Sequence, residues 1–144
     1  MRFWDSSALV PLLVAEPSSL AASAAFEDDP ELLVWWGSTV ECVSALARLE
    51  RENHLDSAGM AGAMRRLAAL GDSWREIQPV SRVRNTAGRM LRVHDLRAAD
   101  ALQLAAAVAA AEDQPASLSF VTLDTRLAQA AQREGFVVIQ PGMG

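Results

Sequence analysis

The sequence predicts an α/β fold with a mainly parallel sheet that is covered by helices on both faces. Short apolar runs typical of strands alternate with helical patterns along the whole chain, without an internal repeat or a low-complexity linker. The chain has 144 residues, of which 51% are hydrophobic, and this is enough for a sizeable core. We therefore expect one domain over residues 1–144.

The first strand and the first helix meet at an aspartate. Residues 2–5 are rich in aromatic side chains that suit a buried, pleated surface, and the run is too short for a helix. We expect Ser6 or Ser7 to cap the following helix, with Pro11 in its first turn. Asp5 then stands at the carboxyl end of the strand, where parallel α/β sheets bind ligands.

The later elements follow from apolar periodicity, from serine or aspartate at helix starts and from glycine at helix ends. The fourth expected helix carries Met60 and Met64 as core residues and stops at Gly71. The expected elements are helices over 19–26, 39–53, 57–70, 81–93, 98–111 and 124–134, and strands over 32–36, 74–80, 118–123 and 136–139.

Composition removes several classes of function. All 13 basic residues are arginines, so the chain has no lysine for a P-loop, a Schiff base or a phospho-acceptor site. The net charge of −5 argues against an extended nucleic-acid footprint but allows a local one. The single cysteine, Cys42, indicates a reducing, cytoplasmic setting, and no targeting or membrane-spanning segment is expected.

Four carboxylates are expected to converge at one edge of the sheet. Asp5 ends the first strand, Asp124 follows the fourth, and Glu41 and Asp100 lie in the first turns of two helices. Strand ends and the starts of the following helices share one edge of a parallel sheet. Because such a cluster repels itself without a cation, it indicates a hard divalent metal, Mg²⁺ or Mn²⁺, of the kind that serves phosphoryl chemistry.

Each acid also has a purely structural interpretation. Glu41 is spaced for a capping box with the serine three residues before it, and Asp124 for a helix N-cap. Asp5 is also compatible with a turn that holds the first helix. Asp100 lies in an alanine-rich helix, where Arg97 and the helix dipole are possible partners. The metal hypothesis therefore depends on the four acids together.

Other polar residues are candidates for supporting roles. Ser7 and Thr122 flank the acids, where a hydroxyl can orient a carboxylate or cap a helix. The arginines of residues 82–92 form a basic stripe, and with Arg48 they are candidates for contacting phosphates. The substrate-binding candidates are Arg48, Arg84 and Arg89. We interpret His54 and His94 as structural or solvated residues, because neither has a second histidine at metal-ligand spacing.

Four segments together resemble the PIN-domain ribonucleases, in particular the small VapC-type toxins of toxin-antitoxin pairs. No single segment is specific, but their order and spacing are, and the resemblance covers the whole chain. The segments are residues 3–9, 38–48, 96–105 and 120–127.

The resemblance implies a three-layer α/β/α fold with strand order 3-2-1-4-5. It also implies that Asp5, Glu41, Asp100 and Asp124 are the metal-binding catalytic acids, with Thr122 as a supporting hydroxyl. It further implies a small antitoxin partner and a homodimer, for which an apolar surface at Trp35 or Trp36 is a candidate interface.

The leading hypothesis is a metal-dependent endoribonuclease that hydrolyses RNA phosphodiester bonds with a metal-activated water. A phospho-acceptor domain would also place acids at strand ends, but the absence of lysine argues against it. The remaining alternative is a non-catalytic interaction domain of PIN-like fold, whose acidic pocket binds basic peptides.

Overall fold

A five-stranded parallel sheet organises the chain, as the computed structural model shows for residues 1–143, which are the residues it describes. Each of the four strand pairings is parallel, and the order is β3-β2-β1-β4-β5. The expected fold class and strand order are therefore confirmed. The strands are β1 (Arg2–Trp4), β2 (Leu32–Trp35), β3 (Arg75–Ile77), β4 (Ser119–Val121) and β5 (Val137–Ile139).

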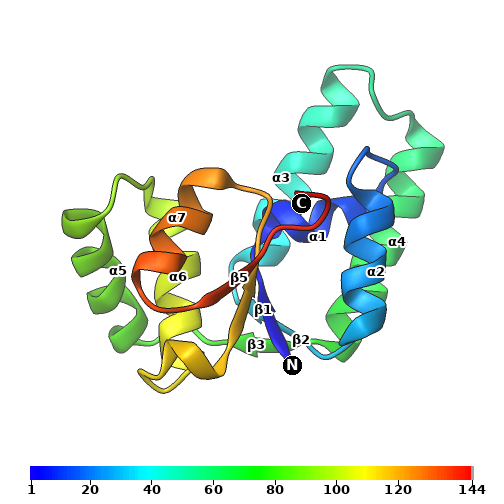
Figure 1. Cartoon of the computed structure of the whole chain (residues 1–144). Coiled ribbons are helices and arrows are strands. Elements are labelled where there is room, and N and C mark those ends of the chain that lie inside the picture. Colours follow the sequence, from blue (N-terminus) through cyan, green and yellow to red (C-terminus); the bar gives the residue numbers. More distant parts are fainter. Residues whose placement is uncertain (144) are drawn as a thin grey trace.

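The helices form a layer on each side of the sheet. Figure 1 shows α5, α6 and α7 on one side and α1 to α4 on the other, which makes the three-layer arrangement. Among residues 1–143 no helix is long and apolar enough to cross a membrane. The helices are α1 (Ser6–Leu13), α2 (Ser19–Asp28), α3 (Ser38–Arg51), α4 (Ser57–Ser73), α5 (Ser81–Val93), α6 (Ala98–Ala110) and α7 (Thr125–Arg133), with a short 3-10 helix at Pro115–Ser117.

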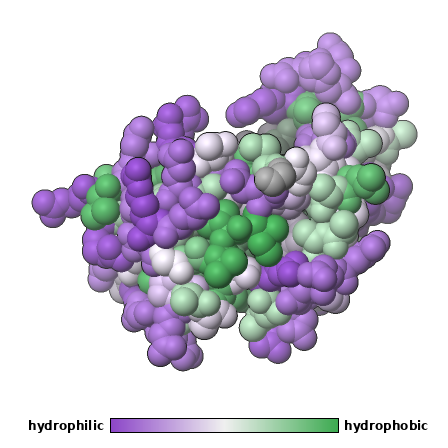
Figure 2. Space-filling model, in the orientation of Figure 1, coloured by the Kyte–Doolittle hydropathy of each residue, from purple (hydrophilic) through white to green (hydrophobic). Residues whose placement is uncertain are grey.

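Alternation along the central strands divides the core in two. Phe3 packs among residues of α5, α6 and α7, and Trp4 packs on the opposite face with α1, α3 and α4. This is the two-residue period of a strand that is buried on both faces. Polar residues dominate the helical flanks in Figure 2, and apolar residues gather between them over the region of β5.

Helix α6 is the most buried helix of the α5–α7 layer. Ala101 and the residues from Leu104 to Ala107 have no exposed surface. Their small side chains allow α6 to pack closely under the sheet, so its first turn is held at the sheet's carboxyl edge. The only fully buried polar side chain of this helix is Gln103, and its amide donates to Ser38 and to Glu41.

The start of α1 differs from the expectation. The helix begins at Ser6 with Asp5 as its N-cap residue, and neither serine caps it with a side chain. Pro11 therefore lies in the second turn, where it removes the N–H that would have bonded to a carbonyl one turn earlier. The serine hydroxyls are engaged by carboxylates instead.

Helix α4 also differs, because it continues past Gly71 to Ser73. The N–H of Trp74 bonds to the carbonyl of Leu70 and ends the helix where the indole becomes buried. Met60 is partly buried against the core, as expected, but Met64 is 37% exposed. The expectation that Met64 fills the core was wrong, because Ala63 and Leu67 occupy the inner face of the helix.

Candidate active site

The structure places the four acids at the carboxyl edge of the sheet. Asp5 and Asp124 follow the neighbouring strands β1 and β4, and Glu41 and Asp100 lie in the first turns of α3 and α6. Their charges interact in three pairs: Asp5 with Asp124, Asp124 with Asp100, and Asp100 with Glu41. The four carboxylates are thus electrostatic neighbours, although they come from distant parts of the sequence.

Asp5 is the most buried of these acids, with only 3% of its surface exposed. The Ser7 hydroxyl donates to its Oδ1 at 2.8 Å, while the Leu123 N–H donates to the same hydroxyl at 2.9 Å. Burial raises the pKa of Asp5 to about 7, against the opposing effect of hydrogen bonds from Ser7 and Thr122, and the charge of Asp124 raises it further. A fixed, poorly solvated carboxylate of this kind gains from a nearby cation.

Glu41 is held from two sides. The Ser6 hydroxyl donates to Oε1 at 2.9 Å, and the Gln103 amide donates to Oε2 at 3.2 Å. The same amide nitrogen donates to the Ser38 hydroxyl at 3.0 Å, so Ser38 forms no capping box with Glu41. Burial raises the pKa of Glu41, and the charge of Asp100 acts in the same direction. The carboxylate is therefore held at both oxygens by neutral donors.

Asp124 has the helix-cap role that was considered from the sequence. Its Oδ1 accepts the Leu127 N–H at 2.9 Å and caps α7, which leaves its other oxygen outside this bond. Its own N–H donates to the Thr122 hydroxyl at 3.0 Å, and this hydroxyl lies 3.2 Å from that of Ser7. Thr122 is fully buried and so joins the surroundings of Asp5 and Asp124.

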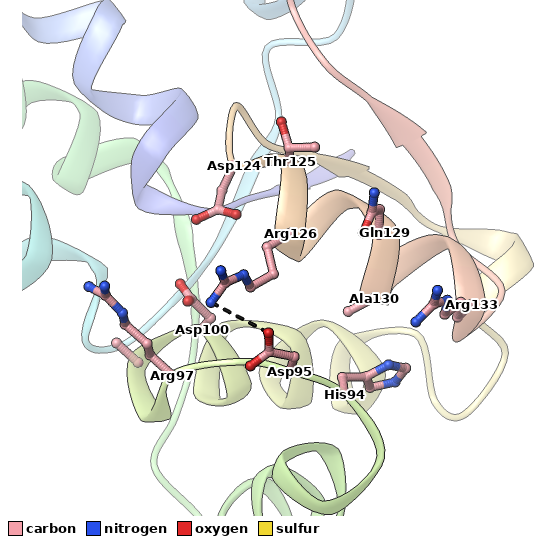
Figure 3. Close-up of a pocket in the computed structure, with 11 residues that line it drawn as sticks. His94, Asp95, Arg97, Asp100, Asp124, Thr125, Arg126, Gln129, Ala130 and Arg133 are labelled. Atoms are coloured by element: carbon pink, nitrogen blue, oxygen red, sulfur yellow. Dashed lines mark ion pairs between the residues drawn. The ribbon is translucent and has the colours of Figure 1, made fainter.

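Asp100 is also a carboxylate with a raised pKa. Burial raises its pKa, as does the charge of Asp124, and the positive charges of Arg97 and Arg126 oppose this. Within residues 1–143 no ion pair joins Asp100 to the Arg97 guanidinium, but a hydrogen bond from the Arg97 backbone also lowers the pKa of Asp100, in agreement with a structural role at the start of α6. Asp100 opens into a pocket, as Figure 3 shows.

The pocket has a volume of about 880 Å³ and lies between α6, α7 and the segment before α6. Asp100 and Asp124 line one end of it. Three arginines also line it, and they come from α7 and from the residue before α6: Arg97, Arg126 and Arg133. The acids therefore adjoin a hollow in which both signs of charge are present.

The donor chemistry suits a hard divalent cation. Oxygen ligands of this charge are those that Mg²⁺ and Mn²⁺ take, and the bond that caps α7 occupies only Oδ1 of Asp124. In residues 1–143, however, no three acidic, histidine or cysteine side chains are close enough together to form a complete metal cage. Mg²⁺ commonly needs only one or two carboxylates, because waters and substrate phosphates complete its shell.

The other predicted residues are dispersed. Arg48 and Arg84 are exposed on α3 and α5, and Arg89 donates to Glu134 at 3.3 Å. None of these three lines the pocket. His94 is buried 2.6 Å from the same glutamate, in agreement with a structural role.

Sequence reasoning missed residues that the structure places around the acids. Gln103 is one of them, and its signal in the sequence is an amide in an otherwise apolar helix, which needs a partner when it is buried. Arg126 was not singled out, and only its position two residues after Asp124 gave a signal. Of the two tryptophans proposed for an interface, Trp35 is buried and only Trp36 is exposed, at 52%.

The structure resembles solved structures over nearly its full length. FitAcB from Neisseria gonorrhoeae matches with a TM-score of 0.67 at 17% identity, covering 100% of both chains. PAE2754 from Pyrobaculum aerophilum matches with a TM-score of 0.60 at 22% identity, covering 96% of this chain and 87% of the other. FitAB bound to an IR36 DNA fragment matches with a TM-score of 0.61 at 16% identity, over 98% and 95%. At these identities the likeness concerns the fold.

The sequence comparison is more specific. No family model matches the chain. Two curated proteins of Mycobacterium tuberculosis, Ribonuclease VapC45 of strain CDC 1551 / Oshkosh and Ribonuclease VapC49 of strain ATCC 25618 / H37Rv, are each 32% identical to it over 133 residues. These residues make up 92% of this chain and 90% of each relative. The resemblance drawn from the sequence is confirmed, and the chain belongs to the VapC family of PIN-domain ribonucleases.

Proposed function

We propose that the protein is a metal-dependent endoribonuclease and the toxin of a toxin-antitoxin pair, and that Asp5, Glu41, Asp100 and Asp124 hold Mg²⁺ or Mn²⁺. The observation that carries this proposal is the gathering of four carboxylates at the carboxyl edge of the sheet, two of which, Asp100 and Asp124, line a pocket. Membership of the VapC family supports RNA as the substrate.

Different residues of the chain hold the individual acids of this site. Ser7 holds Asp5, and Ser6 with Gln103 holds Glu41, so both carboxylates are oriented before a ligand arrives. Asp124 is fixed by its cap to α7. Asp100 and Asp124 both border the pocket, through which a phosphodiester would reach the acids.

A bound divalent ion would supply Lewis-acid stabilisation of the negative charge that develops on the phosphodiester, and it would lower the pKa of a water at the site. Without a cation the acids oppose the approach of an anionic substrate. The same arrangement thus explains why the proposed nuclease requires a metal. The supporting roles proposed for Ser7 and Thr122 are to hold Asp5 and Asp124 in this geometry.

RNA cleavage should require a divalent metal and the acids. We expect Asp5→Asn and Asp100→Asn to lower the cleavage of unstructured RNA by at least about a hundredfold, because each removes charge needed to hold the cation. The measurement is single-turnover cleavage by purified protein with Mn²⁺ or with EDTA. Asp72→Asn, which removes an exposed carboxylate on α4, is the matched control and should cleave normally.

Full activity in both site variants, or cleavage that persists in EDTA, would contradict the nuclease proposal. A folded wild-type chain that cleaves none of a varied set of RNAs with either metal would instead favour the non-catalytic acidic-pocket domain.

We further propose that a small antitoxin inhibits the protein by placing a basic side chain among the acids, since a charge-assisted hydrogen bond would relieve their repulsion. Expression of this chain alone should slow growth of the host cell, whereas Asp100→Asn at equal abundance should not. Growth curves with immunoblots of the soluble protein test this. Normal growth in the presence of abundant folded wild-type protein would remove the support for a toxin.

The stability of the metal-free protein should fall as the pH rises. The pKa of Asp5 is raised from 3.8 to about 7 on folding, so between these values the folded state keeps a proton that the unfolded state has released. The free energy of unfolding therefore decreases through this range, and the penalty is complete above the folded pKa.

Asp5→Asn removes this titration. Its free energy of unfolding, relative to that of the wild type, should increase from about pH 4 to about pH 7 and then stay constant. Urea denaturation in EDTA over this range measures the difference. A difference that does not change with pH would show that folding does not raise the pKa of the Asp5 carboxylate.

A further inference from the structure

The pocket continues beyond the acids along one face of α7. Besides Thr125 at its start, four residues of this helix line it: Arg126, Gln129, Ala130 and Arg133. Their spacing of three, one and three residues is that of a single helix face. At 1.5 Å per residue, Arg126 and Arg133 lie about 10 Å apart along the helix axis. Figure 3 shows Arg126 beside Asp100 and Asp124, and Arg133 at the far end of the pocket.

The direction of α7 links this face to the acidic site. Asp124 caps the helix, so the helix starts at the acids and leads away from them. Arg126 is close enough to Asp100 for its charge to oppose the rise in the pKa of that acid. A polyanion whose reacting phosphate lies at Asp100 and Asp124 would therefore meet Arg126 first and Arg133 next.

Both arginines are available for a ligand. The ion pair of Arg126 with Asp95 is long, at 3.8 Å, and joins side chains that are 57% and 91% exposed, so it contributes little. Within the described part of the chain, Arg133 forms no ion pair. By contrast, Arg2, Arg82 and Arg89 are each bonded to a carboxylate. In a chain with a net charge of −5, the three arginines of this pocket, Arg126 and Arg133 on α7 and Arg97 before α6, are a local concentration of positive charge.

We propose that Arg126 and Arg133 bind the phosphates of the RNA strand on one side of the scissile bond; this rests on the proposed ribonuclease function. Guanidinium groups match phosphate oxygens in a bidentate geometry, and Gln129 lies between them as a further donor. Contacts of this kind position a strand without reading its bases. Arg126 and Arg133, called here the α7 row, would therefore supply affinity and fix the direction of the strand. Base selection would be left to other residues.

The test compares two pairs of substitutions that remove the same charge. Arg126→Gln with Arg133→Gln removes the proposed row, and Arg65→Gln with Arg75→Gln removes two exposed arginines from α4 and β3, outside the pocket. Both pairs are placed in the Asp100→Asn chain, so that RNA is bound without cleavage. Binding of a fluorescently labelled unstructured RNA is measured by anisotropy in EDTA over a series of salt concentrations, and circular dichroism confirms that each variant is folded.

The α7 pair should bind several-fold more weakly at low salt. Its slope of log K against log salt should be smaller in magnitude by about 1.4, since each phosphate contact on a single strand accounts for about 0.7. The control pair should keep the parent slope. In the cleaving chain, the α7 pair should raise KM and the control pair should not.

An equal loss in the two pairs would show that only the net charge matters, and no loss in the α7 pair would show that the strand lies elsewhere; either result overturns the inference. If the wild type cleaves RNA with Mn²⁺ while the α7 pair binds normally, the ribonuclease proposal stands and the α7 row is wrong. A chain that neither binds nor cleaves RNA would overturn both.

Discussion

Mutual repulsion of carboxylates is the constraint on which the rest of the site depends. Parallel strands bring Asp5 and Asp124 side by side, and the first turns of α3 and α6 add Glu41 and Asp100. Two unit charges a few ångströms apart repel by about 4 kcal/mol at an intermediate dielectric, and this must be offset within a marginal stability. Neutral donors and the buried α6 helix hold the acids in place despite this repulsion. The free energy that the repulsion costs would be recovered when a cation binds between the carboxylates.

The donors around the acids are neutral, and this has a functional consequence. Ser6, Ser7 and Gln103 orient carboxylates without cancelling their charge, whereas an arginine in contact would form an ion pair and compete with a metal. Arg126 acts on Asp100 only through its field and remains available along α7. The site therefore keeps its negative charge for a cation and places its positive charge where a polyanion would extend.

The sequence was sufficient for the parallel α/β class, because strands alternate with helices, and for the convergence of the acids, because each acid stands at an element boundary. The strand order came from the resemblance to the PIN-domain ribonucleases and not from these patterns. It was insufficient for contacts across the sheet edge. The bonds from Gln103 to Ser38 and Glu41 join residues more than 60 positions apart, and no local pattern encodes them. The exposure of Met64 and the placement of Arg126 likewise depend on the rotation of each helix about its axis. Apolar periodicity in the sequence defines this rotation only approximately.

The most direct measurement of the central claim is a titration of Mn²⁺ into the purified chain, with free Mn²⁺ followed by electron paramagnetic resonance. The account predicts saturable binding that weakens by at least about tenfold in Asp100→Asn and is unchanged in Asp72→Asn, since only the first variant removes a carboxylate of the cluster. The absence of saturable binding, or equal binding in all three proteins, would contradict the claim that these acids form a cation site.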